Sequence, residues 1–401
     1  MPQATRPPAR AYFLEAVDVV VLLASLSLAS YFVLGKRSRR HVFWLTVFSI
    51  AYFGFFRKGC VCPIGSIQNI ALGLFNNGYA VPVSVMIFFL LPLIFTVLFG
   101  RVFCSSVCPL GAIQDVVVWK PIKVKPWLER GLRAIPFIYL GAAVLFAATG
   151  SAFIICEYDP FISFYRLGGG LDMLLLGAGF LIIGMFIGRP YCRFLCPYGA
   201  ILSLFSRISK WNVWLTEEDC VKCQICDVAC PYGAIASPNE IEEGVKKKTG
   251  VGTFIGLSLL TIVLVVLGAW GGKQLATPFS KTHKTVKLAE IVAADEAGKL
   301  KKESDELKAF KQSARATEEL YYDALKIRYR FVHGGMIFGG FAGLVLGLKL
   351  IGLRFPTQRS IYEPDRSACV ACGRCYAYCP REIVRVKKAE KQKAAVPANK
   401  T

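Results

Sequence analysis

Eight of the fifteen cysteines lie in two runs that share one spacing, C-x2-C-x2-C-x3-C-P. The first cysteine run contains Cys220, Cys223, Cys226 and Cys230, and the second contains Cys369, Cys372, Cys375 and Cys379. Thiolates at this spacing are typical ligands of iron–sulfur clusters, so one-electron chemistry is the first interpretation. Zinc is an alternative, but zinc sites favour two separated C-x2-C pairs. Disulfides are another, but nothing else in these segments indicates an oxidising compartment.

The two cysteine runs resemble the halves of a bacterial two-cluster ferredoxin. In that family the fourth cysteine of each run binds the cluster of the other run. The resemblance therefore implies two [4Fe-4S] clusters. One would be held by Cys220, Cys223, Cys226 and Cys379, and the other by Cys369, Cys372, Cys375 and Cys230.

A second set of thiols, the inner cysteine group, lies in an internal repeat. Residues 100–113 and 188–201 both read G-R-x-[FY]-C-x3-C-P-x-G-A-I and contain Cys104, Cys108, Cys192 and Cys196. Two copies could complete one four-thiolate site, and the glycine after each proline permits close backbone approach. Arg101 and Arg189 could offset the negative charge of such a site, or simply anchor the chain at the membrane surface. Inert buried cysteines are the alternative.

The outer cysteine group consists of Cys60, Cys62 and Cys156. Residues 57–69, RKGCVCPIGSIQN, are a degenerate third copy of the repeat, and Cys156 follows a later apolar stretch. Three thiols could hold a further cluster with a non-cysteine fourth ligand, for which Asp159 is the candidate. A disulfide between Cys156 and either Cys60 or Cys62 is the alternative on an oxidising side.

These cysteines require a scaffold, and the composition predicts membrane helices. The 401 residues are 54% hydrophobic and contain 29 Phe. Apolar stretches long enough to cross, or nearly cross, a bilayer predict about seven transmembrane helices. We expect them at about residues 16–34, 42–56, 81–100, 134–156, 171–188, 251–270 and 332–353. The fold class is therefore an all-α polytopic membrane protein with a small α+β ferredoxin-like module.

Lys and Arg follow alternate predicted spans, as at residues 36–40 and 101–133. The positive-inside rule then predicts an outer N-terminus and a cytoplasmic C-terminus. It also accounts for the net charge of +21 without a nucleic-acid partner, although anionic lipid or an acidic protein could use the same charge. Both cysteine runs fall on the cytoplasmic side because two predicted spans separate them.

This topology divides the chain into six expected parts. They are an N-terminal arm (1–15), a five-helix core (16–210), a first ferredoxin half (211–250), a membrane hairpin with an outer helical insert (251–353, insert 271–331), a second ferredoxin half (354–386) and a disordered basic tail (387–401). The insert is interpreted as an amphipathic helical hairpin, with a docking surface for an outer partner as the alternative.

Repeated C-x3-C-P loops combined with ferredoxin-type runs resemble the membrane polyferredoxins. That family includes the quinol dehydrogenase membrane subunit of periplasmic nitrate reduction and the regulator and electron donor of nitrous oxide reductase. The resemblance covers about residues 40–235 and 369–380. It implies a multi-pass protein of the bacterial inner membrane, working as a subunit of a complex. Electrons would pass between a cytoplasmic or quinone donor and an extracytoplasmic flavoprotein, cytochrome or reductase. A redox-linked assembly or regulatory factor for a copper or haem enzyme is the alternative.

Overall fold

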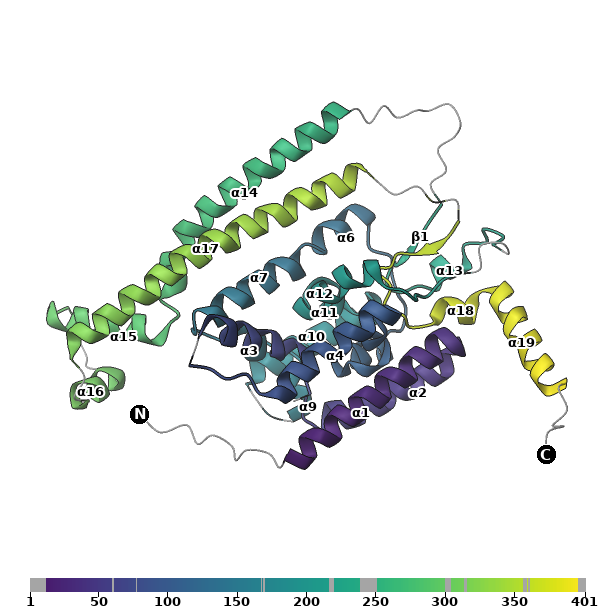
Figure 1. The fold of residues 1–401 in the computed structure, drawn as a ribbon, viewed down its shortest axis with the longest axis horizontal. Coiled ribbons are helices and arrows are strands. Elements are labelled where there is room, and N and C mark those ends of the chain that lie inside the picture. Colours follow the sequence, from purple (N-terminus) through teal and green to yellow (C-terminus); the bar gives the residue numbers. More distant parts are fainter. Residues whose placement is uncertain are drawn as a thin grey trace.

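The structure is a computed structural model that describes residues 12–59, 61–76, 78–166, 168, 170–215, 220–238, 251–299, 304–313, 316–355, 359 and 361–395. This part of the chain is mostly helical. Figure 1 shows an elongated molecule in which helices from the first half of the chain form a bundle, with a long helical hairpin along one side.

The bundle contains several helices that begin at a proline, which is favoured at the first position of a helix. Its elements are α1 (Tyr12–Ser30), η1 (Tyr31–Gly35), α2 (Arg39–Ser49), η2 (Ile50–Phe56), α3 (Pro63–Phe75), α4 (Val83–Phe99), η3 (Phe103–Val107), α5 (Pro109–Val116), α6 (Pro126–Leu132), α7 (Ile135–Ala148), α8 (Ile154–Glu157), α9 (Ile162–Arg166), α10 (Leu171–Phe186), α11 (Pro190–Phe194), α12 (Pro197–Phe205) and η4 (Ser206–Ile208).

The remaining elements are α13 (Ile225–Val228), β1 (Ile235–Ala236), α14 (Val251–Ser280), α15 (Lys284–Glu296), α16 (Asp305–Gln312), α17 (Thr317–Arg354), β2 (Glu363–Pro364), α18 (Arg374–Tyr378) and α19 (Pro380–Ala395). Helix α19 extends through residues 387–395, where we expected the disordered tail to begin.

Four helical segments are long and apolar enough to cross a membrane: Phe13–Gly35, Trp127–Ala148, Val251–Ser280 and Thr317–Arg354. Two shorter apolar helices, Val83–Phe99 and Leu171–Phe186, coincide with two more of the expected spans. The expected span at 42–56 is divided between α2 and η2. Four helices thus have the length and composition that membrane spans need, and the count of seven stays a prediction.

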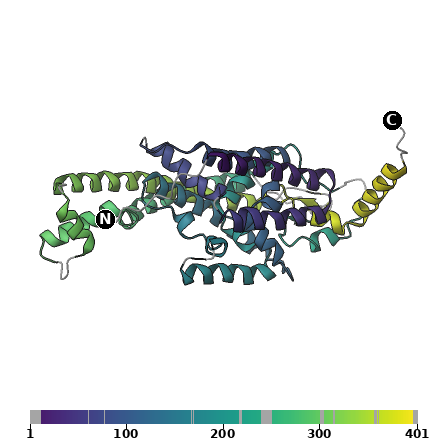
Figure 2. The same cartoon turned by 90° about the horizontal axis from the view of Figure 1, so that it is seen from below.

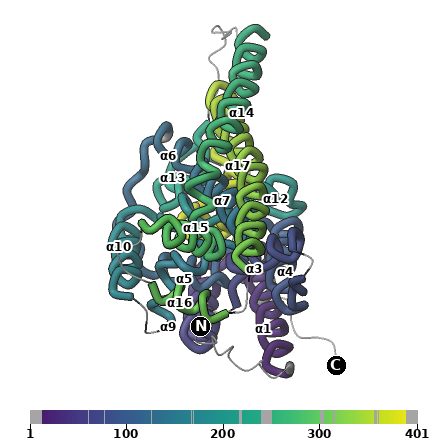
Figure 3. Tube along the Cα trace, turned by 90° about the vertical axis from the view of Figure 1, so that its left-hand side faces the viewer, coloured from purple at the N-terminus to yellow at the C-terminus, as the bar shows by residue number. Residues whose placement is uncertain are grey.

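Helices α14 and α17 form the hairpin because glycines let their backbones touch. A Cβ built on Gly272 would lie 1.9 Å from the carbonyl oxygen of Gly335, and one on Gly268 would lie 2.2 Å from that of Gly339. Small residues at four-residue spacing permit this approach between membrane helices. The two helices lie side by side in Figures 1 and 3.

Beyond the apolar stretch, the hairpin carries its own small core. Val286 and Val292 of α15 and Leu307 of α16 are buried together with Leu320 of α17. Figure 2 shows this insert at one end of the molecule, with α18 and α19 toward the other end. Four apolar residues from three helices therefore make the expected amphipathic insert a folded unit.

The two cysteine runs meet at the end of the molecule opposite the insert. β1 pairs with β2 in an antiparallel ladder, with Ile235 opposite Pro364 and Ala236 opposite Glu363. Two strands of two residues are the only sheet in the described part of the chain, so a complete ferredoxin-like β module is not seen there. The expected meeting of the two halves is nevertheless present.

Candidate metal centres

Three Cys-Pro turns share one local geometry. Cys62, Cys108 and Cys196 each precede a proline at the first position of a helix, namely α3, α5 and α12. Proline is favoured there because its missing N–H would have no partner in the helix. In each turn the glycine three residues after the cysteine donates its N–H to the thiol, with an N–Sγ distance of 3.3 Å for Gly199 and Cys196. The turn at Cys62 in the degenerate third copy therefore folds like the turns at Cys108 and Cys196.

The inner cysteine group comes together from the two copies of the repeat. Burial, followed by the neighbouring thiols of Cys192, Cys104 and Cys196, raises the pKa of Cys108 well above its ordinary value. A bound metal would reverse this tendency, because a coordinating thiol is deprotonated. The structure thus brings these four predicted ligands into one site, while their ligation stays a prediction.

The arginines and glycines of the repeat connect one copy to the other. Arg189 donates to the backbone carbonyls of Cys104 and Ser105, at 2.8 Å for the latter. A Cβ on Gly111 would lie 3.4 Å from Arg189 Nη1, and one on Gly199 would lie 3.4 Å from Arg101 Nη2. The two glycines therefore permit the close approach that the repeat predicted.

Gln114 was not predicted as part of the site. Its Nε2 donates to Cys192 Sγ at 3.3 Å and to the Leu110 carbonyl at 2.8 Å, while its Oε1 accepts from the Tyr191 N–H at 3.2 Å. A hydrogen bond to a ligating sulfur is one of the factors that set a cluster's reduction potential. The same position of the third copy is Gln68, so the repeat did contain a signal for this residue.

Asp115 is a second residue that was missed, and it joins the bundle to both cysteine runs. Its carboxylate lies 2.5 Å from Arg39, 3.1 Å from Arg374 and 3.6 Å from Arg189, and it accepts from the Tyr232 hydroxyl. Burial acts to raise the pKa of Asp115, but the three guanidinium groups overcome this effect and hold it well below its usual range. A buried carboxylate is therefore kept charged by its cationic neighbours.

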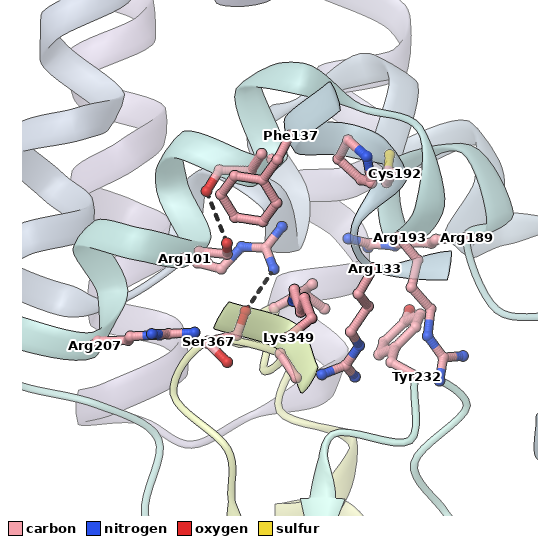
Figure 4. Close-up of a pocket in the computed structure, with 16 residues that line it drawn as sticks. Arg101, Arg133, Phe137, Arg189, Cys192, Arg193, Arg207, Tyr232, Lys349 and Ser367 are labelled. Carbon is pink, nitrogen blue, oxygen red and sulfur yellow. Dashed lines mark hydrogen bonds between the residues drawn. The ribbon is translucent and has the colours of Figure 1, made fainter. Parts of the chain in front are cut away.

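A cavity of about 80 Å³ lies between the inner cysteine group and the second cysteine run. Figure 4 shows the cationic side chains around it and the hydrogen bond from Arg101 to the Ser367 carbonyl, which is 3.1 Å long. Another nitrogen of Arg101 lies 3.8 Å from Cys104 Sγ. The cations lining the cavity are Arg101, Arg133, Arg189, Arg193, Arg207 and Lys349. This positive charge suits a site that holds anionic thiolate clusters.

The cysteine runs form two groups of four. Burial raises the pKa of Cys226 to about 11, and the thiols of Cys379, Cys220 and Cys223 add to the effect. Burial, followed by the thiols of Cys369, Cys372 and Cys230, likewise raises the pKa of Cys375. These neighbours are the groups expected from the exchange of fourth cysteines in ferredoxins, although ligation itself stays a prediction.

The outer cysteine group is described for Cys62 and Cys156, while Cys60 lies outside the described residues. Cys62, Cys156 and Asp159 line one cavity of about 340 Å³ at the start of α3. Burial, followed by Asp159 and then other smaller effects including Cys156, raises the pKa of Cys62 to about 12. The candidate fourth ligand named from the sequence thus lies beside both described thiols.

Within the described ranges, no three His, Cys, Asp or Glu side chains are close enough to share a single metal ion. A [4Fe-4S] cluster binds each of its four thiolates through a different iron, so its ligands need not meet at one point. The four-thiol groups, the thiol hydrogen bonds and the surrounding cations fit such a cluster.

The chain matches the 4Fe-4S binding domain family over residues 81–133 and 170–213, which contain the two copies of the repeat. These features define an iron–sulfur protein of ferredoxin type. An uncharacterised protein of Methanocaldococcus jannaschii is 30% identical over 197 residues, covering 46% of this chain and 79% of that protein. The chain belongs to this family of ferredoxin-type membrane proteins.

Two further relatives confirm the resemblance to the membrane polyferredoxins. The Escherichia coli protein YccM, whose name assigns it provisionally to electron transport, is 24% identical over 42% of this chain and 52% of its own length. The regulatory protein NosR of Pseudomonas aeruginosa is 28% identical over 36% of this chain and 22% of its own length. The chain thus spans about half of YccM and less of NosR. No solved structure matches it.

Proposed function

We propose that this protein is a membrane-bound iron–sulfur electron carrier with two [4Fe-4S] clusters at the cysteine runs and a third at the inner cysteine group. When bound, such clusters supply one-electron transfer. The electrons would move between a cytoplasmic or quinone donor and an extracytoplasmic redox partner such as a flavoprotein, cytochrome or reductase. The protein would then act as a subunit of a larger complex.

The contact between the inner cysteine group and the cysteine runs is the observation that carries this proposal. Cys104 packs against a small apolar cluster that includes Tyr232 and Cys372, together with Cys230 and Cys369. Arg101 connects the same two regions, because its guanidinium reaches both Cys104 Sγ and the Ser367 carbonyl. The two regions are therefore held against each other by both apolar and polar contacts.

The side chains around these thiols have three roles in the proposal. They hold the sulfurs in place, exclude water through burial, and supply positive charge and hydrogen bonds. Each of these factors shifts the reduction potential of an iron–sulfur cluster. Direction of electron flow would follow from the potentials of the two partners.

The proposed orientation places the cysteine runs in the cytoplasm of a bacterium and the α15–α16 insert outside. Support comes from the segment after the first apolar helix. Arg37 pairs with Glu382 at 2.7 Å, and Arg39 donates to the Cys372 carbonyl at 3.2 Å. The cations that the positive-inside rule assigns to the cytoplasm thus contact the second cysteine run.

The test is anaerobic purification of the full-length protein with iron analysis and EPR spectroscopy. Three clusters require about twelve Fe per chain, because each holds four. Cys108→Ala should lose about one third of this iron and one EPR signal, whereas Ser106→Ala, in the same buried loop, should lose neither. Zinc in place of iron would contradict the proposal.

Redox-linked regulation or assembly is the second candidate, favoured by the similarity to NosR, which is named a regulatory protein. Turnover separates the two functions. In vesicles with an internal electron donor and an external one-electron acceptor, a carrier is reoxidised at catalytic rates. Reoxidation that is slow in the wild type, and unchanged in Cys108→Ala, would favour the regulator.

A further inference from the structure

We propose that the outer cavity is a second pseudo-symmetric iron–sulfur site, in which the carboxylate of Asp159 takes the place of one cysteine. The ligands that the described residues supply would be Cys62, Cys156 and Asp159. This inference extends the proposed iron–sulfur function to the other end of the bundle. Its test is independent of the inner cysteine group.

The two loops that form the outer cavity match the two that form the inner site. Cys62 is followed by Pro, by Gly at the third position and by Gln68 at the sixth, as Cys108 is followed by Pro, Gly and Gln114. The partner loops also correspond. Cys192 begins C-x3-C-P, while Cys156 begins C-x2-D-P, with Asp159 directly before the proline.

Asp159 is held by the same kind of backbone contact as the cysteine that it would replace. In the inner site, Cys196 accepts the N–H of Gly199, three residues later. Asp159 accepts the N–H of Phe161 at 2.9 Å and also that of Ile162, three residues later. Only 4% of Asp159 is exposed, yet it lines the cavity with Cys62 and Cys156. Its carboxylate is thus fixed beside the thiols rather than directed to solvent.

Gln68 provides the observation that points most directly to a missing group. Its Oε1 accepts the N–H groups of Ile155 at 3.1 Å and Cys156 at 3.3 Å. Its Nε2 is buried and has no hydrogen-bond partner in the described part of the chain. In the inner site, the equivalent Nε2 of Gln114 donates to Cys192 Sγ. A buried donor without an acceptor is unfavourable, so Gln68 Nε2 fits a site that brings a sulfur atom to it.

Gly65 lies between the two described thiols. Its N–H donates to Cys62, and a Cβ built on it would lie 3.1 Å from Cys156 Sγ. A side chain at this position would press against Cys156, so the glycine lets α3 approach that loop. The cavity of about 340 Å³ in front of these groups is the volume that the cluster would fill.

The experiment uses the full-length protein, purified anaerobically, with iron content and EPR spectra as readouts. Asp159→Ala should lose the iron of one cluster, about four Fe if it is a [4Fe-4S] cluster. Asp159→Cys should keep that iron and change its EPR signal and midpoint potential. Asp172→Asn is the matched control, because Asp172 is an exposed carboxylate outside the cavity and should change neither readout.

Gln68→Leu adds a readout that does not depend on the ligand variants. It should keep the iron and lower the midpoint potential of this cluster alone. The signals of the other clusters report whether each variant is folded. Unchanged iron and spectra in both Asp159 variants would overturn the inference, as would a disulfide to Cys156 found by thiol counting under non-reducing conditions. If the wild type lacks the EPR signal that depends on Cys108, only the proposed function fails. The Asp159 variants test the outer site separately, so the two failures are distinguishable.

Discussion

At the residue scale, Asp115 is a buried carboxylate that pairs with three arginines in the interior. It is fully buried as a side chain, and the three arginines around it come from α2, from the loop before α11 and from α18. Removing one member of a buried ion pair leaves an uncompensated charge, which is far more costly than losing an exposed pair.

Asp115→Ala should therefore lower the free energy of unfolding by about 3–5 kcal/mol, and weaken the attachment of the second cysteine run. The comparison is Asp295→Asn, because the Asp295–Lys311 pair is partly exposed at 2.8 Å and should cost at most about 1 kcal/mol. Thermal unfolding in detergent measures both. Equal losses of unfolding free energy in the two variants would show that the buried ion pairs of Asp115 stabilise the fold no more than an exposed pair does.

Gln114→Leu should lower the midpoint potential of the inner cluster. The hydrogen bond from Nε2 to Cys192 Sγ stabilises the more negative, reduced state. A bond worth about 1 kcal/mol corresponds to roughly 40 mV for one electron, because about 59 mV is a tenfold change in equilibrium. Redox titration followed by EPR measures the shift. Ser106→Ala is the control, and an unchanged potential in Gln114→Leu would contradict the assigned role.

The sequence predicted the thiols far better than the polar residues around them. Cysteine spacing is local, and the resemblance to two-cluster ferredoxins implied how the two runs exchange their fourth cysteines, so these groups of four could be predicted before any fold was known. Asp115 has no such spacing, because its partners Arg39, Arg189 and Arg374 come from distant segments. Gln114 could have been predicted from the repeat, because Gln68 occupies the same position of the third copy.

At the element scale, hydropathy located the hairpin helices but not their ends. Residues 251–270 and 332–353 were expected, whereas α14 continues to Ser280 and α17 begins at Thr317. The additional turns of α17 bury Leu320 and Ala324 against the insert. An apolar count over a window cannot detect a helix end that is stabilised by packing outside the membrane.

Gly272→Val should separate α14 from α17. A Cβ at this position would lie 1.9 Å from the Gly335 carbonyl oxygen, so the helices must move apart, and overpacking of this kind costs at least about 1–3 kcal/mol. The neighbouring Gly271 has nothing within 4 Å of such an atom, so Gly271→Val is the matched control. The melting temperature in detergent should fall only for Gly272→Val. Equal melting temperatures for Gly272→Val and Gly271→Val would contradict close packing of α14 against α17 at Gly272.

At the scale of the whole molecule, α17 is longer than a bilayer requires. Its 38 residues extend for about 57 Å at 1.5 Å per residue, against a hydrocarbon core of about 30 Å. A hairpin of this length would project beyond the membrane, and the α15–α16 insert and the cysteine runs lie at opposite ends of the molecule.

An epitope tag placed after Gly298 should be accessible on the outer face of intact cells, and a tag at the C-terminus only after the membrane is opened. The reason is that α17 would cross the bilayer between the two tags. Antibody labelling of intact and permeabilised cells measures this. Labelling of both tags from the same side would contradict the proposed topology.

The separation of β1 from β2 along the chain also has a consequence for biogenesis. Residues 237–362 lie between the paired strands, and they include both helices of the hairpin. During synthesis the earlier strand emerges without its mate and must wait until α14 and α17 have been translated and inserted. Assembly of the proposed clusters at the paired cysteine runs would therefore be a late event that follows insertion of α14 and α17 into the lipid and could act as its checkpoint.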